Sequence, residues 1–147
     1  MPVSPEFAES NRSQTERMRK LITRLKPTDL LVRLSNGWTV AGALGHIAMW
    51  DRQRLCLMRR WAAGHEAHSA YDGEVFNEAM QPLLELIPAE RVVAFALKTA
   101  EEIDAFLLQV SDEVVSAALA RPDKPNLNRG EHRQYHLDQI ERAVGLL

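Results

Sequence analysis

The sequence predicts an all-α protein, a four-helix bundle with a longer crossover before the last helix. Apolar residues recur at helical spacing along most of the chain, helix-forming residues are abundant, and only 7 of the 147 residues are glycine. No segment shows the polar–apolar alternation of a half-buried strand. We therefore expect one helical domain over residues 1–147, long enough to bury an apolar core between its helices.

Two helices are expected in the first part of the chain. The first covers residues 6–25, where apolar positions fall near helical spacing until Pro27 interrupts the pattern. The Asn-Gly pair at 36–37 marks a turn, and Thr39 can accept a backbone N–H bond as the N-cap of a second helix over residues 40–61. The apolar stripe of this second helix consists of Val40, Ala43, Leu44, Ile47, Leu55 and Met58.

A loop and an irregular segment separate the second helix from the third. Residues 64–73 read as a loop, and residues 75–87 as a short helical piece made irregular by Pro82. Pro88 then opens the third helix, which keeps an apolar stripe for about five turns. The stripe consists of Val93, Ala96, Leu97, Ala100, Ile103, Leu107 and Val110.

The last helix follows a connector and contains two histidines. Residues 121–130 include two prolines and a glycine, so they link elements rather than belong to one. The fourth helix should begin near Glu131 and run to the end of the chain. At helical spacing one arc of it combines His132, His136, Ile140, Ala143 and Leu147, whereas Arg133 falls outside this arc. Both imidazoles are therefore expected to face the interior.

Two adjacent imidazoles in a core need a physical reason. A buried neutral ring must satisfy one donor and one acceptor, and two neighbouring rings cannot both be protonated cheaply. Metal binding is one such reason. The alternative is that His132 and His136 bond to polar side chains or line a hydrated end of the bundle, and their spacing alone is a weak signal.

A third histidine strengthens the metal interpretation. His46 lies at the shoulder of the apolar stripe of the second helix, in its second turn. Counting four antiparallel steps, the second and fourth helices run parallel, which would put His46 at the same end of the bundle as the first turns of the fourth helix. The connector 121–130 is long enough to bring the two helices side by side.

Three segments resemble the DinB-like family, which includes YfiT-type metal hydrolases and thiol-dependent enzymes of the maleylpyruvate isomerase type. They are NGWTVAGALGHIAMWDRQ at 36–53, VFNEAM at 75–80 and HRQYHLDQI at 132–140. The resemblance implies a four-helix bundle, often dimeric, with one divalent metal held by three histidines, which by position are His46, His132 and His136. One departure is Arg133, where many members have an aromatic residue, so the rim of the pocket is expected to differ.

Three neutral nitrogen ligands predict a catalytic rather than a structural metal site. They leave a divalent ion its full charge and at least one open position, where water could ionise or a small thiol could lose its proton. Nitrogen ligands suit zinc, nickel or ferrous iron. The helical base motif of many metalloproteases, H-E-x-x-H, is absent. Together with the resemblance, this favours an enzyme that activates a thiol cofactor such as mycothiol, bacillithiol or glutathione, or water, toward a small electrophile.

Several other residues are candidates for supporting roles. Tyr135 and Gln139 lie beside the histidine pair and could orient a ligand, although ordinary packing at the helix flank is the alternative. Trp50 lies one turn beyond His46 and could wall a cavity or contact a cofactor. A rival pair, His65 and His68, lies in the loop and is interpreted as solvated.

Cys56 is the only cysteine in the sequence. A single cysteine cannot form an intrachain disulfide, and a chain without disulfides suits a reducing compartment. Cys56 falls almost opposite the apolar stripe of the second helix and about 15 Å along the helix axis from His46, so the two cannot form a thiolate–imidazole pair. We expect an inert surface thiol.

The bulk properties limit the partners. The net charge is −2 with basic and acidic residues mixed, which disfavours a nucleic-acid partner. No apolar run reaches the ~20 residues of a membrane span, and the first residues lack the features of a signal peptide, so a cytoplasmic location is expected. The predicted partners are a small-molecule substrate and a second copy of the chain. The alternatives are a non-catalytic helical module that binds a metal or ligand and dimerises, or a metal-free interaction protein.

Overall fold

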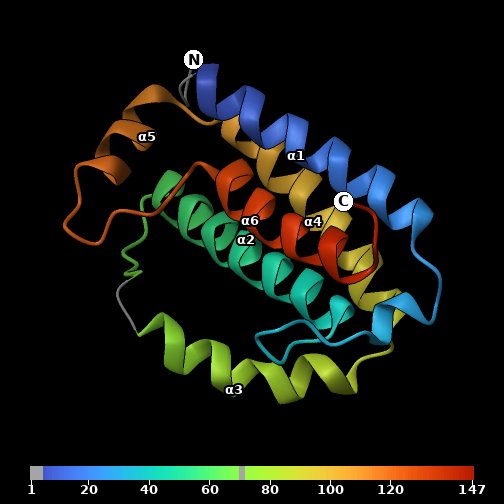
Figure 1. Cartoon of the computed structure of the whole chain (residues 1–147). Helices are drawn as coiled ribbons and strands as arrows, with labels where there is room; N and C mark the ends of the chain where they lie inside the picture. The colour runs from blue at the N-terminus through green and yellow to red at the C-terminus, as the bar shows by residue number, and fades with distance from the viewer. Residues whose placement is uncertain (1–4, 70–71) are drawn as a thin grey trace.

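The computed structural model describes residues 5–69 and 72–147 of the chain, and these are predominantly helical, as the sequence predicts (Figure 1). Within the described residues the only β-pairing is an isolated bridge between Arg33 and Thr39. The elements in chain order are α1 (Pro5–Arg24), a 3-10 turn η1 (Asp29–Leu31), α2 (Val40–Ala62), α3 (Gly73–Leu86), α4 (Ala89–Gln109), α5 (Asp112–Leu119) and α6 (Arg129–Ala143). None of the helices in the described ranges combines the length and the apolar character needed to cross a membrane.

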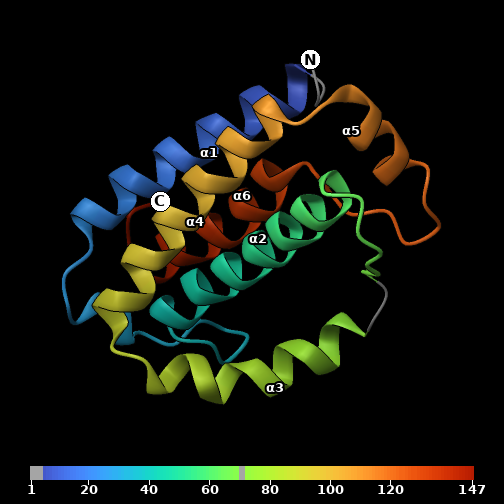
Figure 2. The ribbon, with the colours of Figure 1, turned by 180° about the vertical axis from the view of Figure 1, so that it is seen from behind.

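The helices α1, α2, α4 and α6 pack side by side, and α3 and α5 lie outside this group (Figures 1 and 2). The helix α3 runs along α2 on one side of the molecule. The short α5 lies at one end, within the connection from α4 to α6. The predicted longer connection before the last helix is therefore present, but it includes a helix that the sequence pattern did not reveal.

The direction expected for α6 is wrong. From both sides, α2 and α4 run one way whereas α1 and α6 run the other, so α2 and α6 are antiparallel (Figures 1 and 2). Two pairs of contacts give the same direction, because Asp51 bonds to Arg129 while His46 lies against His136. The counting of turns failed because α3 returns the chain to the end at which α2 began, and α4 then repeats the direction of α2.

The helix α2 begins and is buried as the sequence predicts. The Thr39 side chain accepts a hydrogen bond from the Gly42 backbone N–H at 2.9 Å, which satisfies one of the unpaired donors of the first turn. The following residues, from Val40 to Ala48, are all buried. A helix enclosed over more than two turns can point side chains inward in several directions, and this is how His46 reaches the interior from the shoulder of the apolar stripe.

The helix α6 begins earlier and turns a different face inward than expected. It starts at Arg129, because the Asn128 side chain caps it by accepting a bond from the Glu131 backbone N–H. The residues that it buries are Arg129, Gly130, Arg133, Leu137 and Ile140. His132 and His136 lie at the edge of this buried face, and the Ala143 and Leu147 of the expected inward arc are exposed. Two arginines that pattern reading assigns to solvent thus occupy the interior.

A charged layer separates two apolar clusters in the core. One cluster includes Leu44 and Ile47 of α2, and the other includes Leu55 and Met58 of the same helix. Between them Asp51 is wholly buried and accepts bonds from Arg129 Nε at 2.7 Å and Arg133 Nε at 3.0 Å. Charges removed from water in this way are tolerable only when each is paired and hydrogen-bonded, as these are.

Candidate metal centre

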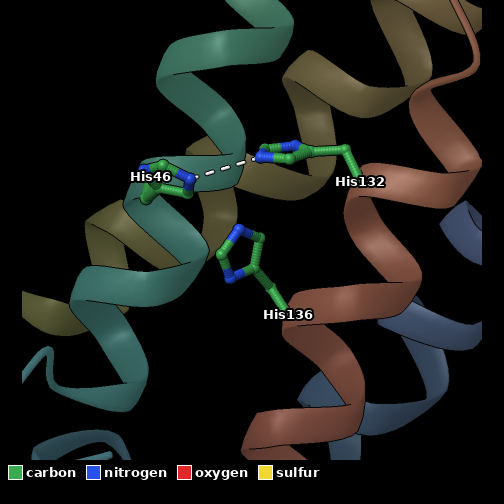
Figure 3. Close-up of side chains that lie close together, drawn as sticks. All are labelled: His46, His132 and His136. Carbon is green, nitrogen blue, oxygen red and sulfur yellow. Dashed lines mark hydrogen bonds between the residues drawn. The ribbon is translucent and has the colours of Figure 1, made fainter. Parts of the chain in front are cut away.

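Three histidines from two helices meet at one point. His46 comes from α2, and His132 and His136 come from successive turns of α6 (Figure 3). Taking one ring nitrogen from each histidine, the three atoms all lie within 4.8 Å of one another. The Nε2 atoms of His46 and His132 are 3.2 Å apart, and the ring of His136 points between them. The structure therefore brings together the three residues that the sequence singled out.

The positions of the rings follow from helix geometry. The four-residue spacing puts His132 and His136 one above the other on α6. Because α6 runs antiparallel to α2 and its first turn is anchored on Asp51, the histidine pair lies opposite residues that precede Asp51, and His46 is one of them. The expected meeting of the rings is thus correct, but it results from an antiparallel arrangement and not from a parallel one.

The spacing of the ring nitrogens suits a metal ion. Nitrogen ligands lie about 2.0–2.1 Å from a tetrahedral zinc ion, so two of them are roughly 3.3 Å apart. The 3.2 Å between His46 and His132 is close to that value. The Nδ1 of His136 is 3.2 Å from the Oε1 of Gln139, which can accept its N–H and so leave the Nε2 lone pair directed at the other rings. The donor set fits a divalent ion, and three protein ligands leave room for another.

Burial keeps the three imidazoles neutral. The pKa of His46 is lowered to about 3, chiefly by burial and further by the charges of His136 and Arg129. Burial and the positive charge of Arg129 also lower the pKa of His132. The pKa of His136 is lowered by burial, which outweighs the opposite effect of its bond to Gln139. A neutral ring, unlike an imidazolium, has a lone pair that can bind a metal ion, so ring charge does not block the site at neutral pH.

Aromatic side chains surround His46. The rings of Trp38 and Trp50 lie 5.4 Å and 6.5 Å from it, both edge to face. Trp50 donates from Nε1 to the Oδ1 of Asn77 on α3 at 2.8 Å, and the guanidinium of Arg54 lies over its ring. Trp50 therefore lies beside the histidine site and ties α3 to α2.

The other candidates lie at the edge of the site or away from it. Tyr135 is 62% exposed and its ring meets the edge of His136, so it lies on the rim. Gln139 contacts a ring nitrogen of His136 directly. His65 and His68 are exposed in the loop after α2, and Cys56 is exposed on α2, as predicted from the sequence.

The burial of two arginines, Arg129 and Arg133, was not predicted from the sequence. Arg133 was expected to alter the pocket rim, but it is wholly buried and pairs with Asp51 and Asp104. It also donates to the Oγ1 of Thr15 and to the backbone oxygen of Asn11. A signal was present, since position 133 is four residues before the buried Leu137. Hydrophobicity patterns overlook such residues because they assign charges to the surface.

An apolar cavity of about 540 Å³ lies between α2, α3 and α4, and the histidines are not among its lining residues. Gly45, which precedes His46, contributes to its wall. A Cβ at this position would approach Val92 within 2.9 Å and Leu84 within 3.1 Å, so the glycine allows α2 to pack closely against its neighbours. The cavity is thus separate from the point at which the rings meet.

No protein-family model, curated protein or solved structure matches the chain. The chemistry of the site is thus read from its own residues. Three buried, neutral imidazoles can bind a divalent ion, and the positive charge of Arg54 nearby favours an anionic ligand beside it.

Proposed function

We propose that the chain is a metal-dependent enzyme of the DinB-like type, with a four-helix bundle as its scaffold, in which His46, His132 and His136 hold one divalent ion. The observation that supports this most is the approach of three ring nitrogens to within 4.8 Å of one another, on two helices whose sequences are far apart. Zinc, nickel and ferrous iron all suit this donor set.

A divalent ion with an open position lowers the pKa of a thiol or a water molecule, which can then attack a small electrophile. The protein's own contribution is to place and shield the reacting groups. Gln139 orients the ring of His136, and Trp38 and Trp50 exclude water from one side of His46. The low-molecular-weight thiol proposed is mycothiol, bacillithiol or glutathione. The carboxylates of bacillithiol and glutathione complement positive charge beside the site.

We also propose that the enzyme is a homodimer. Val75, Leu83 and Leu86 of α3 are 61%, 55% and 81% exposed, and α3 has no buried residue. A helix with this much exposed apolar surface is a reasonable contact surface for a second copy. Sedimentation of wild type and of the Leu83→Glu variant tests it, since a dimer through α3 should dissociate in the variant.

Metal analysis tests the site. Protein purified without an affinity tag should contain close to one equivalent of a divalent metal, and His46→Ala and His136→Ala should each lose most of it. His65→Ala and His68→Ala are matched controls, because both residues are exposed and lie in the loop. Stoichiometric metal that persists in His46→Ala or His136→Ala would contradict the proposed ligands.

Turnover distinguishes the enzyme from a binding module. Metal-loaded protein is incubated with model electrophiles, with and without each thiol, and both thiol adducts and hydrolysis products are quantified. Product that requires a thiol supports transfer or isomerisation, and product without one supports hydrolysis. Metal binding with no product under either condition would favour a non-catalytic module.

A further inference from the structure

Arg129 connects the buried charged layer to the histidine site. Its side chain is 2% exposed, and it donates from Nε to Asp51 Oδ1 at 2.7 Å and from Nη1 to the backbone oxygen of Asn126 at 3.3 Å. Its remaining nitrogen, Nη2, is 3.0 Å from Nδ1 of His132. The three nitrogens of this guanidinium thus each contact a different partner, and one of the partners is a predicted metal ligand.

The contact with Arg129 determines where His132 carries its proton. A guanidinium has donors and no acceptor, so Nδ1 of His132 must be the acceptor and the proton of the neutral ring must lie on Nε2. That Nε2 atom is the one that lies 3.2 Å from Nε2 of His46. His132 therefore donates to His46, whose own Nε2 must be free of a proton.

The three rings consequently do not present equivalent atoms. His46 directs a lone pair at the meeting point, and so does His136, whose Nδ1–H is taken by Gln139. His132 presents an N–H there instead. A nitrogen that carries a proton cannot bind a metal ion, so two of the three ligands are ready and the third is not.

We propose that Arg129 is a positioning residue that holds His132 in the tautomer that cannot bind metal through Nε2, so that loading the site requires Arg129 to release His132. The inference rests on the proposed function, since it concerns the same three histidines. The contact to Arg129 then competes with metal binding. A buried hydrogen bond to a charged group corresponds to a factor of about ten to a hundred in an equilibrium constant, so the wild-type affinity is lower by about that factor than without the contact.

The informative variant is Arg129→Lys. Lysine keeps a positive charge beside Asp51 but has no second nitrogen with which to reach His132. The matched control is Arg54→Lys, because the positive charge of Arg54 also lowers the pKa of His132 and acts on the ring through its charge. The second variant, should Arg129→Lys fail to fold, is Arg129→Met combined with Asp51→Asn. It removes the donor to His132 and the buried carboxylate together, so that Asp51 is not left as a charge without this partner.

Two measurements are made on each protein. Two-bond ¹⁵N–¹H correlation spectra of metal-free protein report which nitrogen of His132 is protonated, and competition with a chelator gives the zinc affinity. In wild type we expect the proton on Nε2. In Arg129→Lys we expect a loss of this preference and zinc binding about ten- to a hundredfold tighter, whereas Arg54→Lys should leave the tautomer unchanged and alter the affinity much less.

The outcomes separate this inference from the proposed function. A proton on Nδ1 in metal-free wild type, or equal zinc affinity in wild type and Arg129→Lys, would overturn the role of Arg129 while leaving the metal site intact. If Arg129→Lys binds zinc and the wild type does not, the proposed role of Arg129 is supported. Zinc binding by none of the proteins would overturn both.

Discussion

Individual buried residues in this protein are defined by what they bond to as much as by how apolar they are. Arg133 is wholly buried because Asp51, Asp104 and Thr15 satisfy its donors. His46 is 8% exposed and remains neutral because burial disfavours its charged form. Changing the protonation of His46 or removing Arg133 should therefore change the free energy of unfolding measurably.

The histidines make the stability of the metal-free protein depend on pH. The folded-state pKa of His46, about 3, lies below the ordinary value of 6.5, so the unfolded chain takes up this proton first as the pH falls. The free energy of unfolding therefore does not depend on this residue above about pH 6.5. Below that pH it decreases, by at most about 1.4 kcal/mol per pH unit for His46. Urea unfolding of metal-free protein between pH 7.5 and 5 measures the slope.

His132 and His136, whose pKa values are also lowered, add to this slope. His46→Gln should give a shallower dependence on pH. The double variant His65→Ala/His68→Ala, which alters exposed loop residues, should keep the wild-type slope. Stability that is constant from pH 7.5 to 5 in wild type would show that the rings are not buried in their neutral form.

Removing Arg133 should destabilise the protein strongly. Arg133→Ala leaves Asp51 without one of its two buried partners and Asp104 without its ion pair. Breaking a buried ion pair in this way costs about 3–5 kcal/mol. The control is Arg52→Ala, whose half-exposed pair with Glu102 should contribute about 0–1 kcal/mol. Equal losses in the two variants, measured by urea unfolding, would contradict the importance of the charged layer.

Between elements, close approach of backbones determines which helices can be neighbours. The helices α1 and α6 meet at Gly130, whose backbone N–H donates to Asn11 Oδ1 at 2.7 Å. Asn11 in turn donates to the backbone oxygen of Leu127, so one side chain of α1 holds the start of α6. The first turn of α6, and with it the histidine pair, is placed by this contact.

A side chain at position 130 should separate these helices. A Cβ there would overlap Oγ of Ser10 and lie 2.5 Å from its backbone carbonyl. Since backbone cannot move aside cheaply, Gly130→Ala should cost about 1–3 kcal/mol and lower the melting temperature. Gly73→Ala is the control, because its Cβ would meet Trp50 at an ordinary 3.7 Å. A wild-type melting temperature for Gly130→Ala would show that α1 and α6 are farther apart.

The sequence pattern predicted most of the helices, but it missed the helix α5 and the inward face of α6. Apolar spacing and caps located α1, α2 and α4 to within a few residues, because burial on one face of a helix produces that spacing. The helix α5 was missed, since eight residues with two buried side chains leave little periodicity. The inward face of α6 was misassigned because Arg129 and Arg133 occupy positions that hydrophobicity scoring gives to solvent.

At the scale of the whole molecule, the histidine site joins two helices that are far apart in the sequence. His46 belongs to α2, and its partners belong to α6. Helices that are far apart in the sequence are costly to bring together, because the chain between them must be ordered first. An ion bound by both helices would therefore stabilise the entire arrangement, including the contacts of α1 and α4 with α6 and α2.

Zinc should raise the melting temperature of wild type. At a free concentration 100 times its dissociation constant, a ligand that binds only the folded state contributes about 2.7 kcal/mol, or roughly 5–10 °C for a chain of this size. His136→Ala should show little or no increase, and the loop variant His68→Ala should respond as wild type does. Calorimetry with and without zinc, after removal of metal by a chelator, measures the difference. An equal increase in His136→Ala would place the ion elsewhere.

The sequence by itself determined the helical class, the N-cap of α2, the apolar stripes of α2 and α4, and the three histidines worth examining, because these depend on local spacing and residue chemistry. Only the tertiary structure decided the direction of α6 and the burial of Arg129 and Arg133. Direction depends on how the whole chain returns through α3. Burial of a charge depends on partners such as Asp51, which is 78 residues before Arg129 in the sequence and contacts it only in the folded protein.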